Sequence, residues 1–225
     1  MAMPVSFVIP VLNEQATVAA LLHDLRRRYP AGELIVVDGG SEDRTVEIAM
    51  PLCDQLLIGE RGRANQMNLG GNVATSRYLF FLHADTCPTI TAPKLEACLA
   101  LQPRWGFCRV QLSGARWPFR MIEWCMNQRS WLTSVATGDQ MLFMEASVFQ
   151  LVGGFDAVPL MEDIALSKRL RRLARPTIIR EPVLTSSRRW EEGGVVLTVL
   201  RMWLLRLAYF VGVPPGTLWR YYYGR

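Results

Sequence analysis

The sequence predicts an α/β fold in which a mostly parallel, open sheet is flanked by helices. Short continuous apolar runs, rich in β-branched or aromatic residues, are typical of strands buried on both faces of a sheet. They occur at Val5–Ile9, Leu34–Val37, Gln55–Ile58 and Tyr78–Leu82. Segments with helical spacing lie between them, at Thr17–Tyr29, Arg44–Met50 and Ala64–Ala74. This alternation implies βαβ units, whose ligands bind at the carboxyl ends of the strands.

The pattern changes after residue 100. Further strands are predicted at Trp105–Leu112, Gln140–Met144 and Thr177–Arg180. Further helices are predicted at Trp117–Trp131, Glu145–Val152 and Met161–Ala174. With 225 residues and no linker, we expect one main domain over residues 1–190 and a C-terminal helical tail over residues 191–225.

Charge is concentrated at the C-terminal end. The net charge is +5, and residues 176–225 carry seven Arg and three Glu, so 7 − 3 = +4 of it lies there. A basic tail indicates an anionic partner, and lipid and nucleic acid both satisfy that criterion. No helix-turn-helix, zinc or RNP pattern is present, so we expect no nucleic acid. Five cysteines without a CxxC pair or signal peptide indicate reduced thiols in a cytoplasmic protein.

Polar residues follow the first two predicted strands. Pro10 to Glu14 stand where a dinucleotide-binding domain needs glycines, which argues against NAD or FAD. Asn13 and Glu14 are candidate site residues, and helix capping ahead of Thr17 is the alternative. Asp38, followed by two glycines, can accept hydrogen bonds from a base or ribose. Its alternative is a tight turn in which Asp38 binds its own backbone.

The fourth strand leads into two potential metal ligands, His83 and Asp85. Residues two apart on an extended segment point to one side, so both can face a diphosphate. A carboxylate suits a hard divalent cation, and the imidazole suits Mn²⁺ better than Mg²⁺. The alternatives are a helix or turn cap for Asp85 and a core histidine for His83.

Three further signals are weak taken singly. Arg61 and Arg63 precede a helix, which makes an anion site, although surface arginines are the alternative. Asp139 precedes a strand. Glu162 and Asp163 open a helix, where acidic groups also act simply as partners of the helix dipole.

Taken in order, these residues resemble a known family. Pro10-Val-Leu-Asn13-Glu14, Val37-Asp38-Gly-Gly-Ser41, His83-Ala-Asp85, Gly138-Asp139-Gln140 and Glu162-Asp163 are similar to the motifs of family 2 glycosyltransferases of the GT-A fold. The resemblance covers roughly residues 4 to 190. The stretch from Arg61 to Asn68 resembles a small bacterial branch labelled as associated with arsenosugar biosynthesis.

The resemblance implies roles for individual residues. Asp163 would be the general base, with Glu162 beside it, and Asp85 with His83 would hold Mn²⁺ or Mg²⁺. Asp139 would face the acceptor, together with Gln140 and Trp190. The donor, a nucleotide-diphospho-sugar, would be bound by Asp38 at its base or ribose and by Arg63 at its phosphates. Other donor-side residues would be Pro10, Asn13, Glu14, Arg61, Gln66, Asn68, Ala84 and Arg189.

The sequence departs from the family pattern at two positions. His83 stands where the metal motif usually has an aspartate. Ser186-Ser-Arg-Arg189-Trp190 resembles the QxxRW motif of processive members, but Ser186 replaces the glutamine. We therefore expect transfer of one sugar, with inversion, to an acceptor hydroxyl that is lipid-linked or belongs to a small molecule. The rivals are a non-catalytic nucleotide-sugar-binding protein and a sugar-phosphate nucleotidyltransferase.

The tail contains a nineteen-residue apolar segment, Val195–Val213. Arg201 and Arg206 lie within it, and each costs about 2.5–3.5 kcal/mol at mid-membrane, which argues against a spanning helix. An interfacial helix with snorkelling arginines would make the protein peripheral on an anionic inner membrane face. A helix packed on the body, or on a second subunit of a homodimer, is the alternative.

Overall fold

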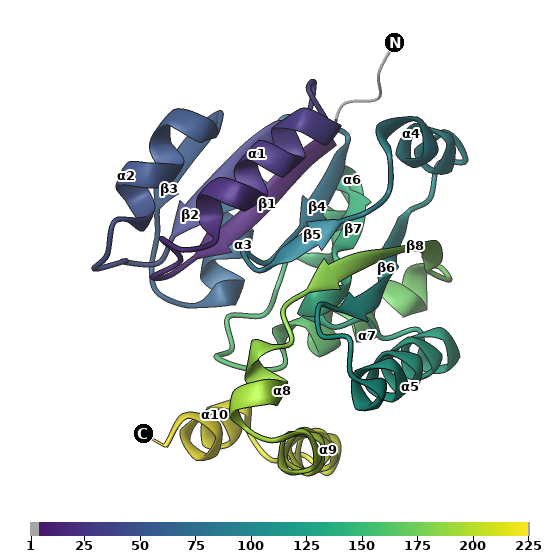
Figure 1. Cartoon of the computed structure of the whole chain (residues 1–225). Coiled ribbons are helices and arrows are strands. Elements are labelled where there is room, and N and C mark those ends of the chain that lie inside the picture. The colour runs from purple at the N-terminus through teal and green to yellow at the C-terminus, as the bar shows by residue number, and fades with distance from the viewer. Residues whose placement is uncertain (1–4, 225) are drawn as a thin grey trace.

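The computed structural model describes residues 5–224, apart from the side chains of Arg189 and Glu192. In this part of the chain one eight-stranded sheet carries helices on both faces (Figure 1). Its strand order is β3-β2-β1-β4-β7-β6-β8-β5. The strands are β1 (Val5–Val11), β2 (Glu33–Asp38), β3 (Gln55–Ile58), β4 (Tyr78–Phe81), β5 (Thr86–Pro88), β6 (Trp105–Leu112), β7 (Leu142–Glu145) and β8 (Thr177–Thr185).

The first half of the chain forms the parallel part of the sheet. Strands β1, β2, β3 and β4 pair in parallel, with Val8 opposite Ile35 on one side and Phe81 on the other. All seven residues of β1 are buried. The prediction of strands buried on both faces is therefore confirmed for β1, β2 and β4. It is wrong for β3, which lies at the edge of the sheet and has no buried residue.

The second half makes the sheet mixed. Strand β7 runs antiparallel to both β4 and β6, β5 runs antiparallel to β8, and β6 and β8 are parallel. Among the described strands this gives four parallel pairs and three antiparallel pairs. The prediction of a mostly parallel sheet is thus confirmed by a margin of one strand pair. Antiparallel neighbours need no crossover helix, so their order is hard to predict from the sequence.

Helices cover the two faces and form two separate cores. The helices are α1 (Val18–Arg28), α2 (Thr45–Ala49), α3 (Arg63–Val73), α4 (Ala92–Ala100), α5 (Trp117–Thr133), α6 (Ala146–Val152), α7 (Glu162–Leu173), α8 (Arg188–Glu192), α9 (Val195–Phe210) and α10 (Pro215–Tyr223), with short 3₁₀ turns η1 (Met50–Leu52) and η2 (Gly138–Gln140). Phe7 and Ile9 of β1 pack toward α1, α2 and α4, whereas Val8 packs toward α3, α6 and α7. Successive strand residues point to opposite faces, so each strand serves both cores.

Several elements differ from the sequence prediction. Strand β5 and helix α4 were not predicted, since β5 is three residues long and ends in Pro88. Strand β8 continues to Thr185, beyond the predicted end at Arg180. Gln140 belongs to the η2 turn and not to the following strand, because the capping box between Thr137 and Gln140 closes that turn.

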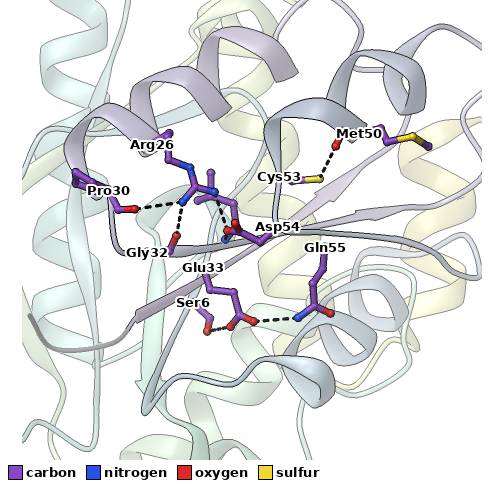
Figure 2. Close-up of polar contacts among 10 residues, drawn as sticks. Ser6, Arg26, Pro30, Gly32, Glu33, Met50, Cys53, Asp54 and Gln55 are labelled. Atoms are coloured by element: carbon purple, nitrogen blue, oxygen red, sulfur yellow. Dashed lines mark hydrogen bonds and ion pairs between the residues drawn. The ribbon is translucent and has the colours of Figure 1, made fainter.

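The amino ends of β1, β2 and β3 carry a polar cluster that supports the fold (Figure 2). Glu33 accepts hydrogen bonds from Ser6 and from Gln55, the latter at 2.9 Å. Asp54 accepts from Arg26 and from the Leu34 N–H, both at 2.7 Å. Burial opposes the charge of Asp54, but these two donors lower its pKa. The carboxylates of Glu33 and Asp54 thus tie the amino ends of these strands together.

The C-terminal helices pack against the body near α7 and α5 (Figure 1). Leu205 of α9 and Leu218 of α10 join Met161 and Ile164 at the start of α7 in one apolar cluster. Helix α9 ends at Phe210, three residues before the predicted end of the apolar segment. Among the described residues no helix combines the length and apolarity that crossing a bilayer requires. The division of the chain at residue 190 stays a prediction.

Candidate active site

A pocket opens at the carboxyl edge of the sheet. It has a volume of about 430 Å³ and lies between the ends of β4 and β8, helix α8 and helix α9. A smaller pocket adjoins it and shares Arg63, His83, Asp139 and Met202 with it. Seven residues predicted from the sequence line the two pockets: Arg63, His83, Asp85, Asp139, Glu162, Asp163 and Trp190.

Glu162 and Asp163 occupy the start of α7. Asp163 accepts hydrogen bonds from the Gly138 N–H and the Ile164 N–H, both at 2.7 Å. Burial raises the pKa of Asp163 more than these two hydrogen bonds lower it. Burial and the neighbouring Asp163 raise the pKa of Glu162, which is 6% exposed, to about 7. Two adjacent carboxyl groups with raised pKa values are a combination found at acid–base sites.

Replacing Glu162 by Gln is expected to stabilise the protein at alkaline pH. Between the ordinary pKa of 4.5 and the folded value of about 7, the native state binds more protons than the unfolded state, so stability falls as pH rises. Above pH 7 the buried Glu162 is ionised and lowers the free energy of unfolding by its full amount. Removing the ionisable group should therefore raise the free energy of unfolding by about 1–3 kcal/mol at that pH. Chemical denaturation at pH 8 measures the gain, which should vanish near pH 4.

Glu96→Gln is the matched control for this experiment, because Glu96 is an exposed glutamate on α4. It should change the unfolding free energy by no more than about 0.5 kcal/mol at either pH. A Glu162→Gln protein that is less stable than wild type at pH 8 would contradict the assignment of a strained, buried carboxylate.

His83 lies between the two pockets and against η2. Its Nδ1 is 3.8 Å from Oδ1 of Asp139, and a Cβ added at Gly138 would stand 2.5 Å from Cε1 and Nε2 of the ring. The glycine therefore lets the imidazole approach the backbone segment that also holds Asp163. The structure links His83 and Asp163 through two consecutive residues of the η2 turn, Gly138 and Asp139.

Two arginines surround these carboxylates. Arg63 opens α3, and although desolvation alone would lower its pKa, nearby acidic groups, led by Glu162, raise it. Arg129 of α5 was missed by sequence reasoning. Burial lowers the pKa of Arg129, opposed by Asp163 and Asp139, and its Nε has no hydrogen-bond partner within the described part of the chain. No sequence signal marks Arg129, because it follows an apolar, Trp-rich helical pattern.

The predicted donor residues at the ends of β1 and β2 lie outside the two pockets. Asp38 accepts hydrogen bonds from the Gly40 and Ser41 N–H groups, both at 2.9 Å, so it makes the tight turn that was the alternative. Asn13 accepts from the Glu42 N–H at 2.8 Å. Glu14 accepts from the Thr17 hydroxyl at 2.8 Å, at the start of α1. Contacts of these residues with a nucleotide stay predictions.

Three residues predicted to contact substrate make hydrogen bonds within the fold, and their contacts with substrate stay predictions. Gln66 is buried and its Nε2 donates to the carbonyls of Val11 and Val37, which ties α3 to β1 and β2. Asn68 exchanges two hydrogen bonds with the Phe155 backbone, at 2.8 and 2.7 Å. Gln140 is fully buried and accepts from the Ser130 hydroxyl at 2.8 Å. Buried amides need partners, and the fold supplies them to Gln66 and Asn68, whereas Nε2 of Gln140 has no hydrogen-bond partner among the described residues.

The remaining predicted donor residues are placed as follows. Pro10 is buried within β1 and pairs with Val37, and Ala84 is buried between the two candidate metal ligands. Arg61 is exposed on the loop before α3. Arg189 lies in α8, and its side chain falls outside the described part of the structure.

The metal motif offers an imidazole and a carboxylate. His83 and Asp85 line the larger pocket together with Asp139. Among the described residues no group of three or more His, Cys, Asp or Glu could hold a metal ion. Binding of a divalent cation by His83 and Asp85 stays a prediction.

Comparison with known proteins agrees with this geometry. Residues 6–100 match the model of the family described as glycosyl transferase family 2. A PGL/p-HBAD biosynthesis glycosyltransferase of Mycobacterium bovis (strain BCG / Pasteur 1173P2) is 39% identical over 94 residues, which cover 38% of this chain and 37% of that protein. The chain thus matches little more than a third of the length of this relative.

Two solved structures share the fold. S. aureus TarS 1–349 in complex with UDP superposes with a TM-score of 0.67 at 16% identity, covering 82% of this chain and 60% of that one. Glucosyl-3-phosphoglycerate synthase from Mycobacterium tuberculosis, in complex with Mn²⁺, UDP and phosphoglyceric acid, gives a TM-score of 0.61 at 17% identity, covering 94% and 80%.

The sheet, with polar residues gathered at its carboxyl edge, defines a GT-A glycosyltransferase fold. Over residues 6–100, less than half of its length, the chain is similar to glycosyltransferase family 2. The resemblance to the branch associated with arsenosugar biosynthesis stays a prediction.

Proposed function

We propose that the protein transfers a single sugar from a nucleotide-diphospho-sugar to an acceptor hydroxyl, with inversion at the anomeric carbon. The observation that carries this proposal is the pair of adjoining pockets, of which Asp163 lines the smaller, Asp85 lines the larger and Arg63 lines both. The smaller pocket thus offers a buried carboxyl group, and the larger offers candidate diphosphate-binding groups. The names of the relatives and the ligands of the neighbouring structures support the same reaction class.

On the donor side, Arg63 binds the diphosphate. Its positive charge is held among carboxylates that raise its pKa, so it stays protonated at any working pH. Asp85 and His83 are the residues that would hold a divalent cation, Mn²⁺ or Mg²⁺, which would offset the charge that builds on the leaving diphosphate. Mn²⁺ is present in the neighbouring synthase structure.

On the acceptor side, Asp163 takes the proton of the attacking hydroxyl. The acceptor oxygen forms a bond to the anomeric carbon as the bond from that carbon to the diphosphate oxygen breaks, and the electron pair leaves with the diphosphate. One displacement inverts the anomeric centre. The two backbone N–H groups that bind Asp163 fix its carboxylate in place, and Asp139 completes this side of the pocket.

Trp190 lines the larger pocket from α8 and provides a face on which a sugar ring can stack. Arg189 beside it is assigned to the pyrophosphate by its position in the motif. Because Ser186 replaces the glutamine of processive members, we assign the protein to the transfer of one sugar.

The test uses the full chain with a panel of UDP-, GDP- and dTDP-sugars, with and without Mn²⁺. A true donor should raise the melting temperature, and the shift should grow when Mn²⁺ is added. Mass spectrometry then follows release of the nucleoside diphosphate and its transfer product with simple hydroxyl acceptors. No melting shift and no nucleoside diphosphate release with any donor would refute the proposal.

A further inference from the structure

Helix α5 exposes an unusual apolar face. Trp117, Trp124 and Trp131 recur at helical spacing and point to solvent, with Trp117 at 73% exposure and Trp124 at 60%. Exposed Met121 and Leu132 lie on the same helix. Soluble monomers rarely leave several large apolar side chains together on one face, so this surface indicates a partner.

Helix α9 exposes a second apolar face. Its exposed side chains, apart from Arg201, are all apolar: Val196, Leu197, Leu200, Trp203, Leu204, Leu207 and Phe210. Trp203 alone is 67% exposed. The opposite side of the helix is packed, because Leu205 joins the cluster at the start of α7. The helix is therefore covered by the body on one side only.

The two faces are neighbours. Phe119 and Ile122 of α5 pack in one cluster with Val195 and Val199 of α9, and both helices lie at the same end of the molecule (Figure 1). We call their exposed apolar side chains, listed in the two preceding paragraphs, the α5–α9 face. The surface comes from two segments that are more than sixty residues apart in the chain. It is therefore formed by the fold and not by a single amphipathic helix.

The exposed charges carried by α5 and α9 themselves have one sign, although Glu191 of α8, just before α9, is also exposed. Between residues 193 and 225 the sequence contains no Asp or Glu, and between 116 and 133 its one carboxylate is Glu123, which is buried. Exposed arginines accompany the apolar side chains, with Arg116 just before α5 and Arg201 within α9. Two helices that expose tryptophan and arginine and carry no exposed carboxylate of their own have the composition of surfaces that insert at the boundary of an anionic bilayer.

We infer that the α5–α9 face docks the protein on the surface of an anionic lipid bilayer. The tryptophans enter the headgroup boundary, and Arg116 meets lipid phosphates. Arg201 adds positive charge to the face while its guanidinium donates to the Tyr221 and Tyr222 carbonyls of α10. The other side of α9 contributes Met202 and Arg206 to the smaller pocket, so docking brings the pocket close to the lipid surface. The inference concerns binding alone and does not depend on the proposed reaction.

Vesicle flotation tests this directly with the full chain. Vesicles of phosphatidylcholine with about a quarter phosphatidylglycerol should carry the protein upward at low salt. Vesicles of phosphatidylcholine alone should carry at least tenfold less, and raising the salt to about 1 M should remove most of the binding, because screening acts on the arginines. Arg116→Gln should weaken binding to the anionic vesicles about fivefold.

The decisive variant is Trp124→Glu with Trp203→Glu, which puts a carboxylate on each helix. It should lose at least tenfold of the vesicle binding and keep the wild-type melting temperature, since both side chains face solvent. The matched control is Leu101→Glu with Leu151→Glu, since these two side chains are also highly exposed, Leu101 at 82%, but lie at α4 and α6. The control should float like the wild type.

Three results would overturn the inference. The first is no flotation of the wild type with anionic vesicles, and the second is equal flotation of wild type and the Trp124→Glu, Trp203→Glu protein. The third is a wild-type dimer by light scattering that this variant dissociates, without vesicle binding by either protein. In that case the face joins two copies of the chain.

Discussion

Asp163→Asn is expected to lower the rate of sugar transfer by about 10³-fold or more and to leave the dissociation constant of the donor within about threefold of wild type. The substitution keeps the size of the side chain but removes its ability to accept a proton. It also disturbs the local hydrogen bonding. The Gly138 and Ile164 N–H groups each donate to one carboxylate oxygen, and an amide offers only one oxygen to the two donors. Single-turnover transfer and donor titration measure the two effects separately.

Glu162→Gln is the control for this prediction, because Glu162 is the adjacent residue and also lies in the pocket. It should retain much more transfer activity than Asp163→Asn, since Glu162 is assigned no proton transfer. Turnover of Asp163→Asn close to wild type would remove Asp163 from the role of base. An equal loss in both variants would instead assign the proton to the carboxyl pair.

The convergence of the pocket residues was predictable because of the parallel half of the sheet. Strands buried on both faces appear as continuous apolar runs, and their carboxyl ends share one edge, so His83 and Asp85 could be expected at an edge where ligands bind. The polar residues that follow β1 and β2 lie outside the two pockets. The prediction was less accurate in the mixed half of the sheet, since β5 and α4 are short and their sequences show no strong periodicity. Prediction therefore worked best where both faces of a strand are covered.

The uses of individual polar side chains were harder to predict. Sequence patterns place Gln66 and Gln140 beside the motifs, but only the folded chain reveals that the Val11 and Val37 carbonyls and the Ser130 hydroxyl are their partners. Asp38 shows the same limit, because a carboxylate before two glycines suits a ribose and a turn equally well. Arg129 was missed for the opposite reason, since its helix reads as apolar.

The tail shows a different kind of ambiguity. An apolar segment of this length was consistent with packing on the body and with an interfacial position. The structure combines features of both, because Leu205 is buried against α7 while Trp203 points outward. Sequence periodicity could not separate the two, since α9 is apolar around most of its circumference and its partner surface on α5 lies far away in the chain.

Gly138→Ala should reduce transfer about 10²-fold and destabilise the protein by about 1–3 kcal/mol. The added Cβ would stand 2.5 Å from two atoms of the His83 ring, too close for any real contact, and the aromatic ring cannot yield without leaving its position between the pockets. The same residue donates its N–H to Asp163, so movement of the turn would also misplace the proposed base. Transfer kinetics and chemical denaturation measure the two losses.

A double-mutant cycle separates crowding from a general weakness of the turn. If contact with the ring causes the loss of stability, His83→Ala with Gly138→Ala should be more stable than the sum of the single changes by about 1 kcal/mol or more, because the smaller side chain makes room for the methyl group. Transfer should stay low in the double variant, since the imidazole assigned to the cation is gone. Gly216→Ala, where an added Cβ meets no atom within 4 Å, should leave both activity and stability close to wild type. Additive losses in the cycle would show that the η2 turn itself cannot accept a side chain, and that His83 does not require Gly138 for its placement.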